Sequence, residues 1–389
     1  MNHMLNLWVN ILTYNKVLGR NLRLLGNIWK KVYNNDLTVI FYTFTVKIIE
    51  QTNSPKILKD SFNRIARKLR ISVTDKCNMK CIYCMPNGNI KWFDNKEILN
   101  FQEIVRITSI FTQLGITKVR ITGGEPLLRP SLENLIRDLT KIQNIKTISM
   151  TTNGLLLEDK ISQLKSSGLN SLNISLDTFR EERFRTLNGI SNLNKVLNGI
   201  QKARDLGFKI KINTVIIRDW NDDEIINFVK FARDTKLTVR FIEFMPLDGS
   251  GIWNHNLVVT KQEIIKKIES NFHNVISFDE NNNSSFQSDP ASVYNFDDGK
   301  GKIGFISSIT EPFCSNCDRV RLTSDGRFLT CLFEKEGYDL KKMIRNAKTD
   351  QEIMDYILSC HTKKPEGIVE LIRINGLRPT LNLMHTIGG

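Results

Sequence analysis

Residues 69–84 read "LRISVTDKCNMKCIYC" and combine a short apolar segment with three cysteines. The first six positions, 69–74, have the apolar pattern and β-branched content that predict a β-strand. The cysteines follow in the spacing C-x3-C-x2-C, at Cys77, Cys81 and Cys84. Thiolates grouped this tightly indicate a zinc or iron–sulfur site. No fourth Cys or His lies nearby in the sequence, whereas a structural zinc ion takes four protein ligands.

An alternation of strands and helices continues from this first strand. Further strands are predicted at 118–122, 146–154, 171–177, 209–216 and 238–247, and helices at 100–115 and near 131–142, 157–167, 192–206 and 222–235. Strands that alternate with helices of ten or more residues argue for a parallel sheet joined by right-handed crossovers. We therefore predict an α/β fold, an incomplete (βα)6 barrel of the TIM type, because a complete barrel has eight such units.

The unusual residues of this region fall where each predicted strand ends. In barrels of this type the chemistry is found at the carboxyl ends of the strands. After the cysteine loop, the residues at these ends are "GGEP" (123–126), "TTNG" (151–154), Ser175, Asp177, Met245 and Pro246. Their placement is the strongest internal support for the barrel.

A second cysteine group follows the barrel region. "CSNC" (314–317) is followed by "RVRLTSDGRFLTC" (319–331), in which Asp325-Gly326 predicts a two-residue hairpin turn. The hairpin would return Cys331 to the side of Cys314 and Cys317. Three ligands again suggest an iron–sulfur cluster with one open iron, and a zinc ribbon is the alternative. Cys360 lies in a helical stretch, where it is expected to pack as a small apolar residue.

Basic residues gather around the same predicted mouth. The chain has a formal net charge of +14, which favours anionic partners. Arg319 and Arg321 alternate and so point to one face of their strand. Two guanidinium groups beside an open cluster suit a phosphate group. The other basic residues on predicted strands are Arg70, Lys118, Arg120 and Lys211.

Composition and the chain ends set further limits. Seven cysteines are too few and too clustered for a secreted disulfide framework, and no apolar run approaches the length of a membrane span. Residues 1–60 are interpreted as an extension outside the fold, either a targeting segment or a mis-assigned start. We predict a barrel over 64–250 and a cluster- and substrate-binding region over 251–389.

C-x3-C-x-Tyr-C after a first strand resembles the radical S-adenosylmethionine superfamily. In that family the open iron of a 4Fe–4S cluster binds the amine and carboxylate of S-adenosylmethionine. One-electron reduction then yields a 5′-deoxyadenosyl radical. The resemblance implies that Tyr83, Gly124, Ser175 and Met245 bind this cofactor.

Within that superfamily, residues 64–389 resemble the GTP 3′,8-cyclase family of molybdenum cofactor biosynthesis. The marks are both cysteine groups, the Arg319/Arg321 pair and the terminal Gly388-Gly389. The resemblance implies a second 4Fe–4S cluster, hydrogen removal from C3′ of GTP, ring closure at C8, and a Gly-Gly end that reaches the active site. The implied GTP-binding residues are Arg70, Lys118, Arg120, Thr151, Lys211, Arg319, Val320 and Arg321.

The expected partners follow from the same resemblance. They are GTP, a reductant protein, the next enzyme of the pathway and a second copy in a homodimer, with no nucleic acid and no membrane. The expected compartment is the cytoplasm, or the mitochondrial matrix if residues 1–60 are a transit peptide. Two other interpretations stay open: another radical enzyme with an auxiliary cluster, for example one that modifies peptides, and a basic zinc protein that binds nucleic acid. The second lacks a visible aromatic stacking platform.

Overall fold

The computed structural model describes residues 56–85, 90–247, 251–272, 276–278, 290–334, 336–375 and 384–388. The extension expected at 1–60 lies outside these residues except for 56–60, and Gly389 also lies outside them. Residues 56–60 take part in the fold, because Leu58 is fully buried and Lys59 forms a β-bridge with Ile65.

Six parallel strands stand side by side in chain order and form the main body of the sheet. They are β1 (Lys68–Ser72), β2 (Lys118–Thr122), β3 (Thr147–Thr152), β4 (Ser171–Ser175), β5 (Lys209–Ile216) and β6 (Thr238–Glu243). The predicted α/β fold with a parallel sheet is therefore confirmed.

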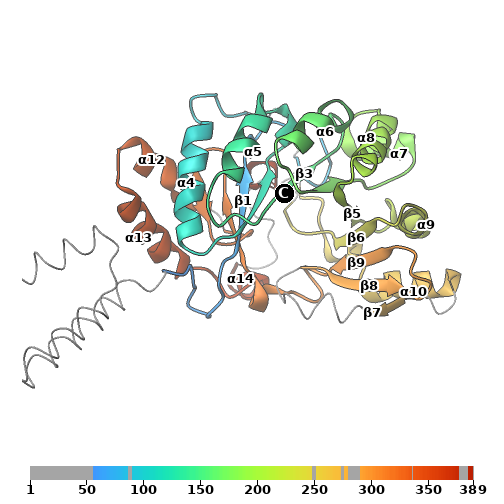
Figure 1. The fold of residues 1–389 in the computed structure, drawn as a ribbon. Coiled ribbons are helices and arrows are strands. Elements are labelled where there is room, and N and C mark those ends of the chain that lie inside the picture. Colours follow the sequence, from blue (N-terminus) through green and yellow to red (C-terminus); the bar gives the residue numbers. More distant parts are fainter. Residues whose placement is uncertain are drawn as a thin grey trace, which may run out of the picture. The chain divides into compact units, whose positions relative to one another are not determined.

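Helices connect these strands (Figure 1). They are α4 (Phe101–Gln113), α5 (Leu132–Thr140), α6 (Leu157–Ser166), α7 (Glu181–Asn188), α8 (Leu193–Asp205) and α9 (Ile225–Thr235). Helix α4 packs against α5, α5 against α6, and α6 against α8. Local sequence fixes where α4 begins, since Asn100 and Glu103 form a capping box there. Helix α7 was not predicted, and it lies directly before α8.

The C-terminal region adds a strand to each side of this parallel body. Strand β9 (Lys302–Ile306) pairs in parallel with β6, and β10 (Arg319–Leu322) pairs in parallel with β1. The antiparallel strands are β7 (Ile276–Phe278) and β8 (Ser292–Phe296) beyond β9, and β11 (Arg327–Leu329) and β12 (Tyr338–Asp339) beyond β10. The predicted barrel region and the C-terminal region therefore share one sheet.

The C-terminal region also contributes α-helices to the described structure. They are α10 (Lys261–Asn271), α12 (Leu340–Arg345), α13 (Asp350–His361), α14 (Ile368–Asn375) and α15 (Met384–Ile387). Cys360, on α13, is buried in the apolar core as expected. Helix α13 packs against α4, so a late helix covers an early one (Figure 1). No helix among the described residues has both the length and the apolar character needed to cross a membrane.

Side-chain alternation separates the core from the functional face of the strands. On β1, Leu69 and Ile71 are fully buried in the core, whereas Lys68 and Arg70 line a cavity on the opposite face. The β10–β11 hairpin forms as predicted, but its turn is longer than expected. Three residues, Ser324 to Gly326, lie between Thr323 and Arg327, and Gly326 has a φ of +84°. A glycine with positive φ is typical of this three-residue loop.

Candidate active site

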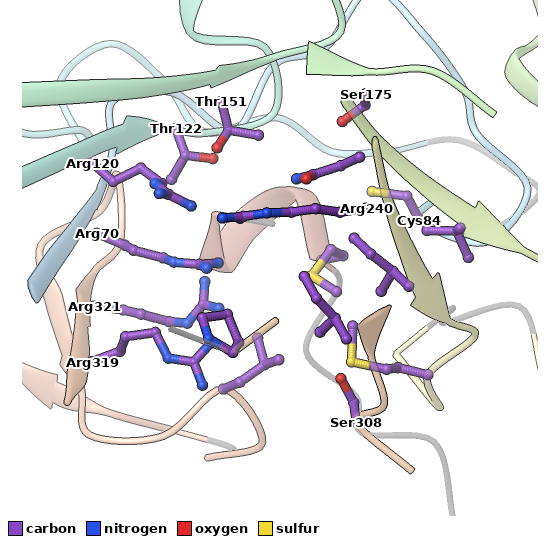
Figure 2. A pocket seen from close by; sticks show the side chains of 18 of the residues that line it. Arg70, Cys84, Arg120, Thr122, Thr151, Ser175, Arg240, Ser308, Arg319 and Arg321 are labelled. Carbon is purple, nitrogen blue, oxygen red and sulfur yellow. The ribbon is translucent and has the colours of Figure 1, made fainter. Parts of the chain in front are cut away.

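One cavity of about 620 Å³ collects nearly all of the predicted site residues. Figure 2 shows Arg70, Arg120, Arg319 and Arg321 on one side of this cavity and Cys84 and Ser175 on the other. The arginines come from β1, β2 and β10, and Ser175 ends β4. The cavity thus has a cationic end and a thiol-bearing end.

At the thiol-bearing end, the loop of Cys77, Cys81 and Cys84 is held by the end of α7. The Cys81 thiol donates to Asn188 Oδ1 at 3.1 Å, and the Lys80 backbone N–H donates to the Asn188 carbonyl at 2.8 Å. The Met79 backbone N–H donates to Cys77 Sγ at 3.4 Å. The unpredicted helix α7 therefore fixes the shape of the cysteine loop.

The three thiols of this loop could hold an iron–sulfur cluster. Burial raises the pKa of Cys77 to about 11 and that of Cys84 to about 12. Burial, with the charges of Cys84 and Cys77, also raises the pKa of Cys81. Three buried thiolates beside one another would repel each other. Cationic iron atoms would offset this repulsion and stabilise the thiolates. The donor set therefore fits the cluster that the spacing predicts.

The "GGEP" loop packs against the backbone that leads into the cysteine loop. The Gly124 N–H donates to the Thr74 carbonyl at 2.7 Å, and a Cβ at Gly124 would lie 2.3 Å from the Lys76 carbonyl oxygen. Only glycine fits such a close approach. The next residue, Glu125, is fully buried and accepts hydrogen bonds from Thr152 Oγ1 at 2.7 Å and the Asn153 N–H at 2.8 Å.

Tyr83, Ser175 and Met245 line the same cavity, although they come from separate loops and strands. The Tyr83 hydroxyl donates to Asp177, whose other carboxylate oxygen accepts from the Val215 N–H at 2.8 Å. Burial raises the pKa of Asp177 to about 6. The four residues expected at the cofactor, Gly124 included, therefore all line this cavity.

The cationic end is built from two rows of basic residues across three neighbouring strands. Strand register aligns Arg321, Arg70 and Arg120 in one row on β10, β1 and β2. It aligns Arg319, Lys68 and Lys118 in a second row. All six line the cavity, together with Thr151 on β3 and Lys211 on β5. Parallel pairing in register explains why basic residues far apart in the chain meet here.

Like charges perturb one another within these rows. Burial, followed by the charges of Arg321, Arg120 and Arg319, lowers the pKa of Arg70. Burial and the charge of Arg319 lower the pKa of Arg321 to about 10. A bound polyanion would relieve this repulsion, so the electrostatics of this end suit a phosphate-rich ligand.

The second cysteine trio lies at the cationic end. Cys314, Cys317 and Cys331 all line the cavity, and Cys331 is close enough to both others for their charges to raise its pKa, after burial. Burial alone would raise the pKa of Cys317, but the charges of Arg319 and Lys364 lower it to about 6. No three His, Cys, Asp or Glu side chains in the described part of the chain are arranged around a single ion. A four-iron cluster binds its thiolates on separate irons, and three cysteines in one cavity wall could hold it.

The C-terminal tail also reaches the cationic end. Arg321 donates from one guanidinium nitrogen to the Ile387 carbonyl at 3.1 Å and to the Gly388 carbonyl. Gly388 has a φ of +76°, and a Cβ there would lie 2.6 Å from Thr122 Cγ2 at the end of β2. The described part of the tail is thus tied to one of the predicted substrate-binding arginines.

Two differences from the sequence prediction concern individual residues. The Val320 side chain is 1% exposed in the core and faces away from the cavity, so only its backbone remains a candidate contact. The sequence prediction missed Lys68 and Arg240, which also line the cavity. Lys68 precedes Arg70 by two positions, and this alternation could have identified it. Arg240, on β6, lies between the two ends of the cavity (Figure 2).

Comparisons with known protein families divide the chain into two matching regions. The sequence model of the Radical SAM superfamily matches residues 71–232, and that described as Molybdenum Cofactor Synthesis C matches residues 237–369. A crystal structure of Streptococcus suis SuiB bound to S-adenosylmethionine has a TM-score of 0.54 at 16% identity, covering 89% of this chain and 82% of SuiB. At that identity the likeness concerns the fold alone. Fold and site together define a radical S-adenosylmethionine enzyme.

Curated relatives identify the family more narrowly. A GTP 3′,8-cyclase of Thermodesulfovibrio yellowstonii is 40% identical over 85% of this chain and 100% of its own length. One of Clostridium perfringens is 40% identical over 79% of this chain and 94% of its own. Molybdenum cofactor biosynthesis protein 1 of Dictyostelium discoideum is 39% identical, and the match covers 79% of this chain and 49% of that protein. The chain belongs to the GTP 3′,8-cyclase family. As a member, it uses S-adenosylmethionine and a 4Fe–4S cluster.

Proposed function

We propose that this chain converts GTP to (8S)-3′,8-cyclo-7,8-dihydroguanosine 5′-triphosphate, the first step of molybdenum cofactor biosynthesis. The observation that carries the proposal is a single cavity with a cysteine trio at one end and two rows of basic residues at the other. The names of the relatives support it. Family membership favours this function over a peptide-modifying enzyme or a zinc protein that binds nucleic acid.

At the thiol-bearing end, Cys77, Cys81 and Cys84 hold the first cluster. When bound there, the cluster would supply the one-electron reduction that S-adenosylmethionine chemistry needs. The chain's own part is to orient the cofactor toward the substrate. The residues that do so are Tyr83, Gly124, Ser175 and Met245. Arg240 lines the cavity between its two ends, where its guanidinium group adds a positive charge beside the reacting groups.

At the cationic end, Cys314, Cys317 and Cys331 hold a second 4Fe–4S cluster beside the substrate. The depressed pKa of Cys317 supports this assignment, because metal ligation requires the thiolate. The buried guanidinium groups beside the second cysteine trio bind the triphosphate with charge-assisted hydrogen bonds. The substrate-binding residues are Arg70, Lys118, Arg120, Thr151, Lys211, Arg319, Arg321 and the Val320 backbone, with Lys68 added by the strand register.

The residues of this chain act mainly by positioning. Hydrogen removal at C3′ and ring closure at C8 take place within one GTP molecule, so the alignment of the ribose matters more than a general base. We include the tail residues Gly388 and Gly389 in this alignment, because Arg321 holds the Gly388 carbonyl at the substrate end. Gly389 itself lies outside the described residues.

The wider organisation is also a proposal. It comprises a barrel domain over 64–250, a cluster- and substrate-binding region over 251–389, and a homodimer in the cytoplasm, or in the mitochondrial matrix if residues 1–60 direct it there. A reductant protein supplies electrons, and the next enzyme of the pathway receives the product. The basic cavity is assigned to GTP, so neither nucleic acid nor a membrane is a proposed partner.

The test is an anaerobic incubation of the iron-loaded protein with S-adenosylmethionine, a reductant and GTP. The expected products are 5′-deoxyadenosine and cyclised GTP in equal amounts. A matched incubation with ATP tests the purine, and it should give no cyclised nucleotide. Cleavage of S-adenosylmethionine without any change in GTP would support a radical enzyme but contradict the proposed substrate.

A further inference from the structure

A basic residue far along the chain from the second cysteine trio lies directly against it. Lys364 follows α13 and is 3% exposed. Its ammonium group donates to the Cys317 carbonyl at 3.2 Å and the Arg319 carbonyl at 3.0 Å, and Nζ lies 3.8 Å from Cys317 Sγ. Its three N–H groups can therefore serve two carbonyl oxygens and one sulfur atom at once.

In the described part of the chain, the buried charge on Lys364 is met by backbone carbonyl groups and a sulfur atom. Among the described residues, Lys364 forms no ion pair with Asp or Glu, although its side chain is buried. An isolated buried ammonium group costs several kcal/mol of desolvation, so such groups are found beside anions. The neighbouring anion here is the sulfur of Cys317, which becomes a thiolate when it ligates iron.

The segment that carries Lys364 is fixed against the cysteine trio. Arg64 donates to the Pro365 carbonyl at 2.7 Å, the Glu366 carbonyl at 2.6 Å and the Cys314 carbonyl at 3.0 Å. A Cβ at Gly367 would lie 2.6 Å from Cys314 Cβ. The Arg64 side chain ties the backbone of residues 365–366 to the Cys314 carbonyl, and Gly367 packs against Cys314. These contacts hold Lys364 in place beside Cys317.

We propose that Lys364 is a positioning residue of the second cluster, whose charge beside Cys317 stabilises the reduced cluster and raises its midpoint potential. The inference rests on the proposed second cluster. Reduction adds a negative charge, and a cation or N–H donor at a ligand sulfur favours the more negative state. The hydrogen bonds from Lys364 to the Cys317 and Arg319 carbonyl groups also fix the backbone between these two residues. This backbone connects a proposed cluster ligand to a proposed substrate-binding arginine.

The test measures the second cluster alone. Alanine at Cys77, Cys81 and Cys84 removes the first site and gives a background protein with one cluster. In that background, Lys364→Gln removes the charge, Lys364→Arg keeps it, and Lys363→Gln is the matched control. Lys363 is the adjacent, exposed lysine, and its Nζ lies 6.0 Å from the Tyr338 ring centroid. Iron content and a redox titration followed by electron paramagnetic resonance are recorded for each protein.

The expected result is a lower midpoint potential in Lys364→Gln, with Lys363→Gln and Lys364→Arg close to the background protein. Loss of iron from Lys364→Gln alone would also support the inference, because the charge would then be needed to retain the cluster. An unchanged potential in Lys364→Gln, or equal iron loss from the Gln and Arg variants, would overturn it. A background protein without iron would instead refute the second cluster itself, and the inference with it.

Discussion

Cys77 and Cys317 line one cavity, yet their surroundings shift their thiol pKa values in opposite directions. Burial raises the pKa of Cys77 to about 11, whereas Arg319 and Lys364 overcome burial and lower that of Cys317 to about 6. Thiolates at the proposed first site would therefore need bound irons to stabilise them. The second trio has protein cations beside it even before a metal binds. Each trio is thus expected to load independently of the other.

Single cysteine replacements test this independence. We expect Cys77→Ala to lose the iron of the first site and all cleavage of S-adenosylmethionine, while the second site keeps its iron. Cys314→Ala should show the reverse pattern of iron loss. Iron and acid-labile sulfide analysis measures both, with production of 5′-deoxyadenosine as the activity. A normal rate of 5′-deoxyadenosine production by Cys77→Ala would contradict the assignment of the first trio.

The paired arginines of β10 are expected to have separable roles. Arg319→Ala should weaken GTP binding by about 10- to 150-fold, since a charge-assisted contact contributes roughly 1.5–3 kcal/mol. Arg321→Ala should weaken it as well but also release the tail, because Arg321 holds Ile387 and Gly388. Arg327→Ala, on the exposed side of the hairpin, is the control. Calorimetric titration with GTP measures all three, and unchanged affinity in an Arg319/Arg321 double variant would exclude a triphosphate site here.

Glu125 makes the stability of the protein depend on pH. Burial, which outweighs its hydrogen bonds, raises its pKa to about 7, above the ordinary value of about 4.3. Its contribution to folding is therefore fully present below pH ~4.3 and is lost as pH rises through about 7. Between pH 5 and 8, the unfolding free energy of the wild type should fall by up to about 3 kcal/mol relative to Glu125→Gln. Denaturant unfolding of both proteins measures this, and parallel pH profiles would contradict it.

Sequence patterns predict residues of this site where the spacing is local. The cysteine groups, the alternating Arg319 and Arg321, and Gly124 all stand in short motifs. Lys364 could not be predicted in this way, because it meets Cys317 only through the packing of α13 and the segment after it. Asn188 was missed for the same reason, because no sequence pattern in α7 indicates that this helix contacts the cysteine loop.

At the scale of elements, the six barrel strands were predictable, but the partners of β9 and β10 were not. Each barrel strand has a run of apolar, β-branched residues and a helix after it. The pairing of β10 with β1 joins residues about 250 positions apart, and its register depends on tertiary packing. That register is what aligns Arg319 and Arg321 with Lys68 and Arg70. The parallel pairing of β10 with β1 therefore completes the basic rows, which the sequence motifs alone do not define.

The tail element α15 gives the prediction at this scale. Gly388→Ala would strain a residue at φ +76° and bring its Cβ within 2.6 Å of Thr122 Cγ2. We expect both clusters and the GTP affinity to be nearly unchanged, and the cyclised product to be lost, because the tail acts on orientation. Gly299→Ala is the matched control, since its φ of +70° is similar but its Cβ would meet nothing within 4 Å. Full product yield from Gly388→Ala, or from a chain without Gly388 and Gly389, would leave the tail without a role.

At the scale of the whole molecule, the cavity needs both parts of the chain. Barrel strands supply the first cysteine loop and four of the six residues in the basic rows. The C-terminal region supplies the second trio, β10 with the other two row residues, and the tail. The two cysteine trios lie at opposite ends of one space. In the proposed mechanism, a substrate held at the cationic end would face the cofactor held at the other, without leaving the cavity between steps.

The central claim is that hydrogen passes directly from the GTP ribose to the cofactor inside this cavity. GTP carrying deuterium at C3′ tests it in an anaerobic reaction with S-adenosylmethionine and a reductant. The account predicts 5′-deoxyadenosine that contains one deuterium atom, formed together with cyclised GTP that has lost it. Unlabelled 5′-deoxyadenosine, formed alongside a product that keeps the C3′ deuterium, would contradict it.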